Sequence, residues 1–310
     1  MSYADILFKN MCEDIINNGT DTKGQDVRPV WPDGEKAYTI KQFGVVNRYD
    51  LQKEFPALTF RKTGIKSAMD EILWIFQRKS NNINNLAPHI WDEWADKDGS
   101  IGKAYGYQIG VPYLHHKIKL NEDIMDELSD YPSAFLSNVK LSEKANVHMD
   151  QIDSVIYDLK HTPYSRRIMT SIWNFKDLHE MNLQPCCWSC TFNVTDNGGD
   201  KLVLNMVLNQ RSNDVLAANN WNVVQYSLLL MMIAQVCNME AGTLLHVIAD
   251  AHIYDRHVDI IKELITRPMY DAPIVKLNPD IKDFYKFTTD DLTIENYIAG
   301  PQVKNIPIAI

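Results

Sequence analysis

Cys186 stands in a setting that suits nucleophilic chemistry. It directly follows Pro185 and opens a β-like run, with an arginine pair at 166–167 upstream and the polar run Gln-Arg-Ser-Asn-Asp at 210–214 downstream. A cysteine attacks only as its thiolate, and nearby guanidinium groups both lower the pKa of the thiol and hold an anionic substrate over it. The pattern predicts a thiol nucleophile beside an anion site, whereas without the arginines Cys186 is simply a buried thiol.

The arginines that would form this anion site are scattered along the sequence. Arg28, Arg166, Arg167 and Arg211 each fit, taken alone, an ordinary surface charge in an ion pair. Arg166 and Arg167 lie between an expected helix and an expected strand, and Arg211 and Ser212 follow the end of another strand. Forked guanidinium donors at such strand ends favour binding of a phosphate group.

Two further polar residues accompany strongly apolar segments. Residues 65–78 have helical periodicity, and Glu71 lies within their apolar stripe. A carboxylate that faces the core is costly unless it is paired or used, so Glu71 is a site candidate; a boundary glutamate paired with a basic neighbour is the alternative. Asn222 precedes the nearly all-apolar segment 223–237, where it is either a helix N-cap or an amide that reads a base.

The remaining cysteine and histidine patterns point to other chemistry less clearly. Cys187 and Cys190 form a C-x-x-C pair, which is typical of redox exchange or of half a zinc site. The residues after it are strand-like rather than a helix start, and no second cysteine pair follows, so we expect no metal. A thiol hydrolase with His252 as its base stays open, the alternative for His252 being a hydrogen-bonded boundary histidine.

Length and composition limit the class of protein. With 310 residues, 45% of them hydrophobic, the chain can form one compact domain with a sizeable core. The net charge of −9 argues against a general nucleic-acid binder, which needs a basic face. The longest apolar stretch, 228–234 with its flanks, is too short for a membrane span and no signal-peptide pattern opens the chain, so we expect a cytoplasmic protein. Five cysteines in a chain of this size indicate reduced thiols rather than a disulfide framework.

The expected helices and strands place most candidate residues near element ends. Turn residues at 196–200 join two expected strands into a hairpin. Residues 109–148 have no clear pattern apart from a possible helix at 123–128, so we interpret them as an insertion into a single domain. The expected helices are one through Leu7, Met11 and Ile15 and those at 65–78, 149–159 and 223–237, and the expected strands are 37–40, 43–49, 168–173, 191–194 and 201–208.

Taken together, these segments resemble thymidylate synthase, and the resemblance spans nearly the whole chain. It implies one thymidylate synthase domain over residues 1–310. It implies an α+β fold, a single domain with a large twisted mixed β-sheet flanked by helices. It also implies a homodimer in which each active site receives Arg166 and Arg167 from the other subunit, with no membrane or DNA partner. The motifs that carry it are Asp-Glu-Ile-Leu-Trp at 70–74, His-Ile-Trp-Asp-Glu-Trp at 89–94, Gly-Lys-Ala-Tyr-Gly at 102–106, Ser-Arg-Arg at 165–167, Pro-Cys at 185–186, Gln-Arg-Ser-Asn-Asp at 210–214, Asp-Ala-His-Ile-Tyr at 250–254 and Pro-Ile-Ala-Ile at 307–310.

The activity that the resemblance implies is reductive methylation of dUMP to dTMP. Methylenetetrahydrofolate would act as co-substrate and one-carbon donor, leaving as dihydrofolate. The resemblance makes Cys186 the nucleophile that adds to C6 of the uracil. It implies that Glu71, through water, helps move protons at O4 and that Tyr105 orders water for removal of the C5 proton. Asn222 would read O4 and N3 of the base, and Arg211 would favour the thiolate.

The resemblance also implies which residues bind the two ligands. The substrate phosphate would be held by Arg28, Arg211 and Ser212 with the borrowed Arg166 and Arg167. His252 and Tyr254 would bind the ribose hydroxyl, and Asp214 would contact the pterin at the border of the two ligands. The last residues, ending in the Ile310 carboxylate, would close over the site. The implied folate side is completed by Arg61 near the glutamate tail and by Ile90, Trp91, Trp94, Leu183, Ala218, Trp221 and Ala309.

Departures from the family pattern and two rival functions remain. Cys187 stands where many members have histidine, Ala218 where glycine is usual, and Asn220-Trp221 where Pro-Phe is usual, the last three on the folate side. One rival is a hydroxymethylase of dUMP or dCMP, a relative that finishes with water instead of hydride; Asn222 favours uracil, since a cytosine amino group suits an acceptor such as aspartate. The other rival is a catalytically idle nucleotide- or RNA-binding protein.

Overall fold

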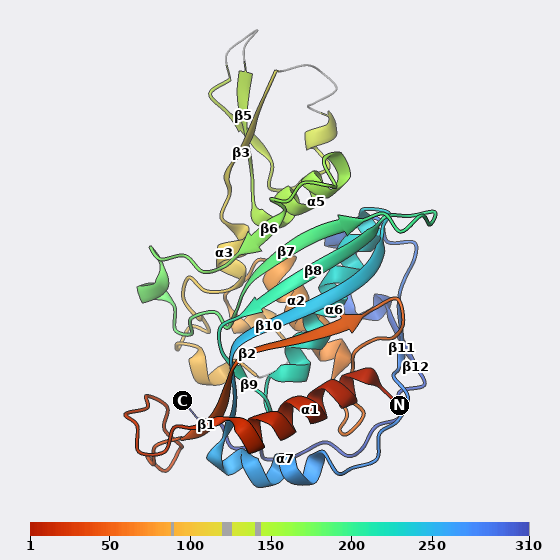
Figure 1. Cartoon of the computed structure of the whole chain (residues 1–310). Coiled ribbons are helices and arrows are strands. Elements are labelled where there is room, and N and C mark those ends of the chain that lie inside the picture. The colour runs from red at the N-terminus through yellow and green to blue at the C-terminus, as the bar shows by residue number, and fades with distance from the viewer. Residues whose placement is uncertain (88–89, 120–125, 140–143, 310) are drawn as a thin grey trace.

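A twisted mixed β-sheet forms the centre of the computed structural model, which describes residues 1–87, 90–119, 126–139 and 144–309 (Figure 1). The longest strand, β10, runs antiparallel to β2 and parallel to β8, and β7 pairs antiparallel with β8. The sheet and its flanking helices confirm the α+β prediction. In sheet order the strands are β1 (Thr20–Asp21), β2 (Thr39–Asp50), β10 (Glu240–Tyr254), β8 (Val203–Gln210), β7 (Cys187–Thr195) and β6 (Met169–Ser171), with the short β9 (Asn213–Asp214) beside β10.

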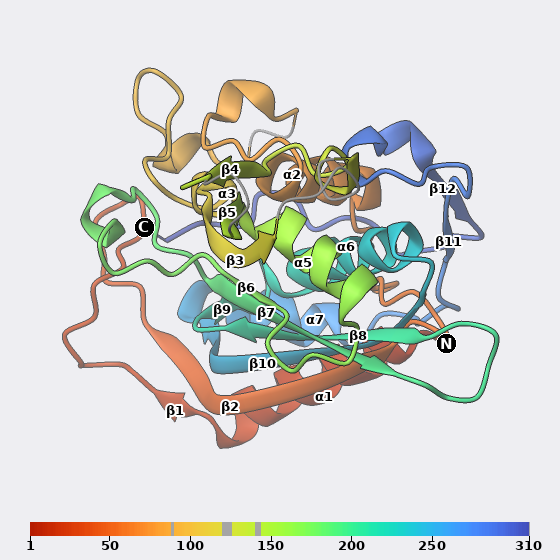
Figure 2. The ribbon, with the colours of Figure 1, turned by 90° about the horizontal axis from the view of Figure 1, so that it is seen from above.

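Helices pack on one face of this sheet and leave much of the other face uncovered. Figure 2 shows α2 (Ile65–Phe76), α5 (Gln151–His161) and α6 (Asn219–Val236) on the same side of the strands. Leu244, His246 and Ile248 of β10 point to this side and are 0% exposed, whereas Val46 and Phe43 of β2 are 55% and 89% exposed. α1 (Tyr3–Asn18) packs along β2, and α7 (Val258–Leu264) follows β10. The uncovered face therefore exposes apolar side chains that helices cover elsewhere.

Most expected elements are present, with informative shifts at their ends. The predicted hairpin is the β7–β8 pair, and the predicted apolar helix is α6, whose middle is buried on all sides. The two strands expected at 37–40 and 43–49 are one continuous strand, β2, paired along its length with β10. α6 begins at Asn219 rather than after Asn222, and its N-cap position is Ala218. Asn222 lies in the first turn of the helix, so the N-cap alternative for this residue is wrong.

Residues 109–148 form much of a small sheet that projects from the main body (Figure 1). It consists of β3 (Tyr113–Lys119), β5 (Lys144–Met149) and β4 (Phe135–Ser137), all antiparallel, and follows the short helix α3 (Gly106–Gly110). Of the helix expected at 123–128, residues 126–128 are helical and 123–125 lie outside the described residues. The remaining elements are the β11 (Ile274–Leu277) and β12 (Leu292–Glu295) pair and the 3-10 helices η1 (Ile83–Asn85), η2 (Asp92–Trp94), η3 (Leu178–Glu180), η4 (Asp255–His257), η5 (Phe284–Lys286) and η6 (Thr289–Asp291).

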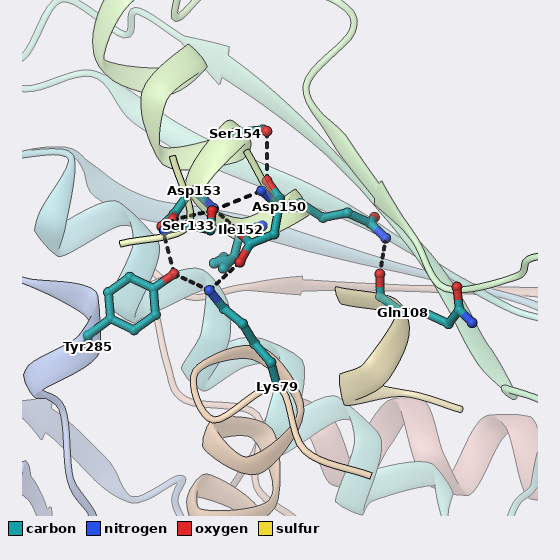
Figure 3. A network of polar contacts seen from close by, with 9 residues as sticks. Lys79, Gln108, Ser133, Asp150, Ile152, Asp153, Ser154 and Tyr285 are labelled. Carbon is teal, nitrogen blue, oxygen red and sulfur yellow. Dashed lines mark hydrogen bonds and ion pairs between the residues drawn. The ribbon is translucent and has the colours of Figure 1, made fainter. Parts of the chain in front are cut away.

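A buried polar network fixes the start of α5 to the main body (Figure 3). Asp150 caps the helix by accepting from the backbone N–H groups of Ile152 and Asp153. Lys79, just after α2, pairs with the Asp150 carboxylate and donates to the hydroxyl of Tyr285 at 2.7 Å. That hydroxyl donates in turn to Asp153 at 2.6 Å. The network joins the end of α2, the start of α5 and the 3-10 helix η5. The chain continues from α5 directly to the arginine pair at 166–167.

We expect Lys79→Met to lower the free energy of unfolding by about 3 kcal/mol, because it leaves the Asp150 carboxylate buried without its cation. The Asp150 side chain is only 1% exposed, so water cannot replace the lost partner. Lys53→Met is the matched control, because Lys53 is 81% exposed and its pair with Asp50 is a surface pair worth less than about 1 kcal/mol. Guanidinium unfolding at a fixed protein concentration measures both; equal effects of the two substitutions would contradict the role of the network.

Candidate active site

Cys186 lies at the entrance to β7, directly beside the end of β8. The antiparallel β7–β8 pair brings the backbone N–H of Arg211 to the carbonyl of Cys186 at 2.9 Å. The Arg211 guanidinium is held by the carbonyls of Pro185 and Gln184 at 2.9 and 2.8 Å, and its Nη2 lies 3.9 Å from the Cys186 sulfur. The predicted neighbourhood of thiol and guanidinium is therefore present, and backbone carbonyls fix its geometry.

The pKa of the Cys186 thiol reflects a balance between burial and positive charge. Burial raises this pKa above its ordinary value, while the Arg211 charge and a hydrogen bond with Tyr105 act in the opposite direction. Arg211 acts in the expected direction, since its charge lowers the pKa of the thiol and so favours the thiolate. Within a single chain, however, burial has the larger effect and the pKa is raised.

Tyr105 contacts Cys186 and Trp91, and Trp91 in turn donates to the Glu71 carboxylate. The Tyr105 hydroxyl accepts a hydrogen bond from the backbone N–H of Cys186 at 3.3 Å, and the Tyr105 ring packs edge-on against Trp91 with centroids 4.7 Å apart. The backbone of Tyr105 has φ 46° and ψ −105°, a conformation that costs a non-glycine residue energy. Strain of this kind is concentrated at functional sites, because surrounding contacts must maintain it.

Glu71 is buried in the apolar stripe of α2, as its spacing predicts, and no basic residue pairs with it among the described residues. Its two carboxylate oxygens accept hydrogen bonds from the indole N–H groups of Trp91 at 3.1 Å and Trp221 at 2.7 Å. Burial raises the pKa of Glu71 to about 7, although these donors and the amide of Gln225 lower it. The alternative of an ordinary ion-paired boundary glutamate is wrong.

Asn222 belongs to a chain of side-chain amides that runs into the core. Its Oδ1 accepts from Gln210 at 3.1 Å, and its Nδ2 donates to Oε1 of Gln225 at 3.1 Å. Gln210 also pairs with the ring of His246 at 2.7 Å. The neighbours thus determine which way the Asn222 amide points, as a group that reads a base requires. Gln210 and Gln225 were not singled out from the sequence, although Gln210 lies in the 210–214 motif and Gln225 stands one helical turn after Asn222.

His252 does not contact the thiol. Its Nδ1 lies 2.8 Å from Asp250, and the polar contacts of the Cys186 side chain and backbone N–H within the described part of the chain are with Arg211 and Tyr105. A thiol–histidine dyad is therefore not formed, which removes the basis of the thiol hydrolase hypothesis. The ring of His252 packs edge-on against Tyr254, whose pKa is raised to about 12 by burial.

The arginines expected at the phosphate are free of carboxylate partners. In the ranges that the structure describes, none of Arg28, Arg166, Arg167 and Arg211 forms an ion pair. Arg28, Arg166 and Arg167 are exposed, and Arg28 lies close enough to Tyr254 to lower its pKa. Within the described ranges of one chain, the side chains of Arg166 and Arg167 form no hydrogen bond with Cys186 or Arg211. Exposed guanidinium groups without internal partners suit an anion or a second chain.

The expected folate side contains half-buried aromatic and aliphatic side chains. Asp214 lies at its edge; burial would raise the pKa of this carboxyl, but His257 and backbone N–H groups lower it overall. Arg61 is buried and donates to the carbonyl of Leu216, and burial lowers the pKa of its guanidinium. Ile90 is 42% exposed. The half-buried members are Trp94, Leu183, Ala218, Trp221 and Ala309, while Trp91 is buried.

The C-terminal segment reaches the same region through His257, which the sequence did not indicate. The Nε2 of His257 lies 2.8 Å from the carbonyl of Pro307, and its Nδ1 lies 3.5 Å from the Asp214 carboxylate. His257 is fully buried and stands within an aromatic group with Trp31 and Tyr254. The terminal residue itself, Ile310, lies outside the described residues, as do residues 88–89.

Among the described residues, the cysteine pair of β7 is not part of a metal-binding group. Cys187 and Cys190 are both buried, and all five cysteines of the chain are free thiols. Among the residues that the structure describes, no group of three or more His, Cys, Asp or Glu side chains is arranged to hold a metal ion. In the same ranges, no helix combines the length and apolar character needed to cross a bilayer.

Comparisons with known proteins agree along the whole chain. The family model described as thymidylate synthase matches residues 7–309. Thymidylate synthase of Bacillus subtilis subsp. natto is 37% identical over 307 residues, and that of Bacillus phage phi3T is 36% identical over 307, each match covering 98% of both chains. The solved structure of thermostable thymidylate synthase A from Bacillus subtilis superposes with a TM-score of 0.82 at 36% identity, covering 99% of each chain.

Proposed function

Because the chain belongs to the thymidylate synthase family, we propose that it converts dUMP to dTMP by reductive methylation, with methylenetetrahydrofolate as co-substrate. The observation that carries the proposal is the Cys186 sulfur 3.9 Å from the guanidinium of Arg211. Tyr105 accepts from the backbone N–H of the same cysteine and packs against Trp91, which donates to the Glu71 carboxylate. A nucleophile, a cation and a proton-transfer group are thus adjacent.

Cys186 acts as the covalent nucleophile. Its thiolate forms a bond to C6 of the uracil, and the electron pair of the C5–C6 double bond moves through C5 toward O4, which makes C5 nucleophilic. The folate, when bound, supplies the one-carbon unit and the hydride. After C5 has bonded to the carbon and lost its proton, the bond between that carbon and the folate nitrogen breaks, which would release tetrahydrofolate and leave a methylene group on C5. Hydride from the tetrahydrofolate would then add to this methylene and leave dihydrofolate, while the C5–C6 double bond re-forms and the Cys186 sulfur is expelled.

Glu71, Tyr105 and Asn222 manage the protons and orient the base. A carboxyl group with a pKa of about 7 can both give and take a proton at neutral pH, so Glu71 suits proton transfer at O4 through water. The Tyr105 hydroxyl is placed to order the water that removes the C5 proton. The Asn222 amide, fixed by Gln210 and Gln225, presents a donor and an acceptor to O4 and N3.

The phosphate site is composite and requires a homodimer. Arg28, Arg211 and Ser212 come from one chain, and Arg166 and Arg167 come from the other. Arg211 lies beside Cys186 and Arg28 lies near Tyr254, whereas Arg166 and Arg167 are exposed and, in the described ranges, form no ion pair and no hydrogen bond with Cys186. The uncovered sheet face is the surface through which two copies associate. Positive charge brought by the substrate-binding arginines of the second chain adds to that of Arg211 and favours the thiolate that burial disfavours.

The groups on the folate side fit a pterin and its aryl tail. Half-buried indole and aliphatic side chains offer flat apolar walls, and the Asp214 carboxylate, with its lowered pKa, is available to accept from ring N–H groups. His252 and Tyr254 bind the ribose hydroxyl on the nucleotide side. Arg61 donates to the Leu216 carbonyl, so its contact with the glutamate tail requires that bond to be shared or exchanged.

Identifying the nucleotide formed from dUMP and methylenetetrahydrofolate tests the proposal. We expect dTMP by mass, together with the rise in absorbance that accompanies dihydrofolate formation. The hydroxymethylase alternative, which predicts a product heavier by one oxygen, is not favoured, because the relatives carry the name thymidylate synthase. An idle binding protein would give neither product nor a covalent complex with 5-fluoro-dUMP. We place the enzyme in the cytoplasm and treat 109–148 as an insertion without an assigned role.

A further inference from the structure

We propose that Trp221 is a positioning residue for Glu71, because its indole N–H and that of Trp91 hold the two carboxylate oxygens from two different elements. This goes beyond the apolar wall that the resemblance assigns to Trp221, and it rests on the proposed proton-transfer role of Glu71. A phenylalanine at this position, the residue usual in the family, would keep the wall and lack the N–H.

The geometry leaves the carboxylate little freedom. Trp221, in the first turn of α6, donates to Oε2 at 2.7 Å, and Trp91 donates to Oε1 at 3.1 Å. An indole N–H can only donate, so each bond requires an oxygen that accepts. Glu71 is 4% exposed and lies in the middle of α2. The shorter of the two bonds comes from Trp221, which also has a half-buried ring.

Trp221 is itself fixed by its neighbour in the chain. The buried amide of Asn220 accepts from the backbone N–H of Leu58 at 3.1 Å and from the hydroxyl of Thr63 at 2.7 Å. It also donates to the carbonyl of Pro56 at 3.0 Å. The start of α6 is thereby attached to the segment before α2, so the indole and the carboxylate are held by one connected unit.

The two indoles act on the charge of Glu71 against its burial. Complete burial raises the pKa of this carboxyl, and among the groups that lower it Trp221 has the largest effect, followed by Gln225 and Trp91. Hydrogen bonds to the charged form favour it over the neutral acid. The result, about 7, lies in the range where a group serves both as acid and as base under physiological conditions.

The titratable groups that face Glu71 among the described residues come from its own helix and from three other elements. Asp70 on the same helix pairs with Arg78 at 2.8 Å. The groups that face it from other elements are Tyr105 before α3, Cys187 of β7 and Tyr226 of α6, and burial raises the pKa of each well above its ordinary value. Tyr105, Cys187 and Tyr226 therefore stay neutral where Glu71 titrates, and the loss of a signal in Glu71→Gln assigns that signal to Glu71.

Trp221→Phe tests the proposal in the free full-length protein. With 13C-labelled glutamate, the carboxyl signal that disappears in Glu71→Gln is followed against pH. We expect its midpoint to rise by about one pH unit in Trp221→Phe, because a donor to the charged form is lost. Trp91→Phe, which removes the longer bond, should give a smaller shift in the same direction, and Trp188→Phe, whose indole makes no bond to Glu71, should give none.

Activity supplies a second measurement with the same sign. The kcat/KM profile has a limb that Glu71→Gln abolishes, and in Trp221→Phe the midpoint of this limb should move to higher pH. At the new optimum pH, kcat should return toward its wild-type value more fully than KM for the folate does. An unchanged midpoint in folded Trp221→Phe would overturn the inference, whether or not the protein makes dTMP. A protein without dTMP synthesis whose Glu71 midpoint still shifts would refute the proposed function and keep the hydrogen-bonding role.

Discussion

Cys186→Ala is expected to bind dUMP and to form no dTMP. The arginines and Asn222 that hold the nucleotide are untouched, whereas the bond to C6 that activates C5 can no longer form. Removing a covalent nucleophile typically costs several orders of magnitude in kcat, so we expect a fall of at least about 10⁴-fold. Absorbance of dihydrofolate measures turnover, and isothermal calorimetry measures dUMP binding.

The matched control is Cys190→Ala, which removes a buried thiol of β7 whose pKa is affected by Thr170 and not by Arg211. It should retain turnover. The covalent complex with 5-fluoro-dUMP and the folate, detected by mass, should form with Cys190→Ala and be absent with Cys186→Ala. Turnover by the Cys186→Ala protein would remove the central element of the mechanism.

Mixing two inactive proteins is expected to restore activity. Cys186→Ala and Arg167→Ala chains, unfolded and refolded together in equal amounts, give heterodimers in half of the dimers, and each heterodimer has one site with both groups intact. About one quarter of the wild-type activity should return, because one site in four is complete. The observation behind this is that Arg167 is exposed and, in the described ranges of its own chain, forms neither an ion pair nor a hydrogen bond with Cys186.

A second mixture separates shared sites from mere refolding. Within one chain Cys186 contacts Tyr105, and Tyr105 packs against the Trp91 that donates to Glu71, so Glu71 and Cys186 belong to the same site. Heterodimers of Cys186→Ala and Glu71→Gln therefore contain no complete site, and no activity should return. Equal recovery from both mixtures, or from neither, would contradict an active site assembled from two chains.

Local sequence patterns predict the positions of helices and strands better than they predict which strands pair with one another. The helix at 65–78, the 191–208 hairpin and the buried helix after Asn222 follow from periodicity and turn residues, and all are present. The sequence predicts two strands at 37–40 and 43–49, whereas long pairing with β10 maintains the single strand β2. Residues 109–148 are stabilised by pairing between segments that are distant in sequence, which local patterns do not report.

The candidate site was predictable in its residues and less so in their contacts. Glu71 was identified as a carboxylate in an apolar stripe, but its partner Trp221 stands 150 positions away and had been assigned only as a wall. The position of Cys186 beside Arg211 follows from a hairpin that the sequence indicates. The net pKa of the thiol does not follow, because it depends on burial by elements from the rest of the chain.

Asn220 also bears on how this sequence can drift over evolutionary time. Three polar groups of the 56–63 segment form hydrogen bonds with its amide. Any single replacement at 220 that lacks both the carbonyl and the NH₂ therefore leaves these buried polar groups without a partner, whichever residue stands at 221. We therefore expect substitutions at positions 220 and 221 to have non-additive effects, because Asn220 fixes the helix start that carries Trp221. Lineages that exchange one of them are expected to have changed the other, along with the loop beneath, in close succession.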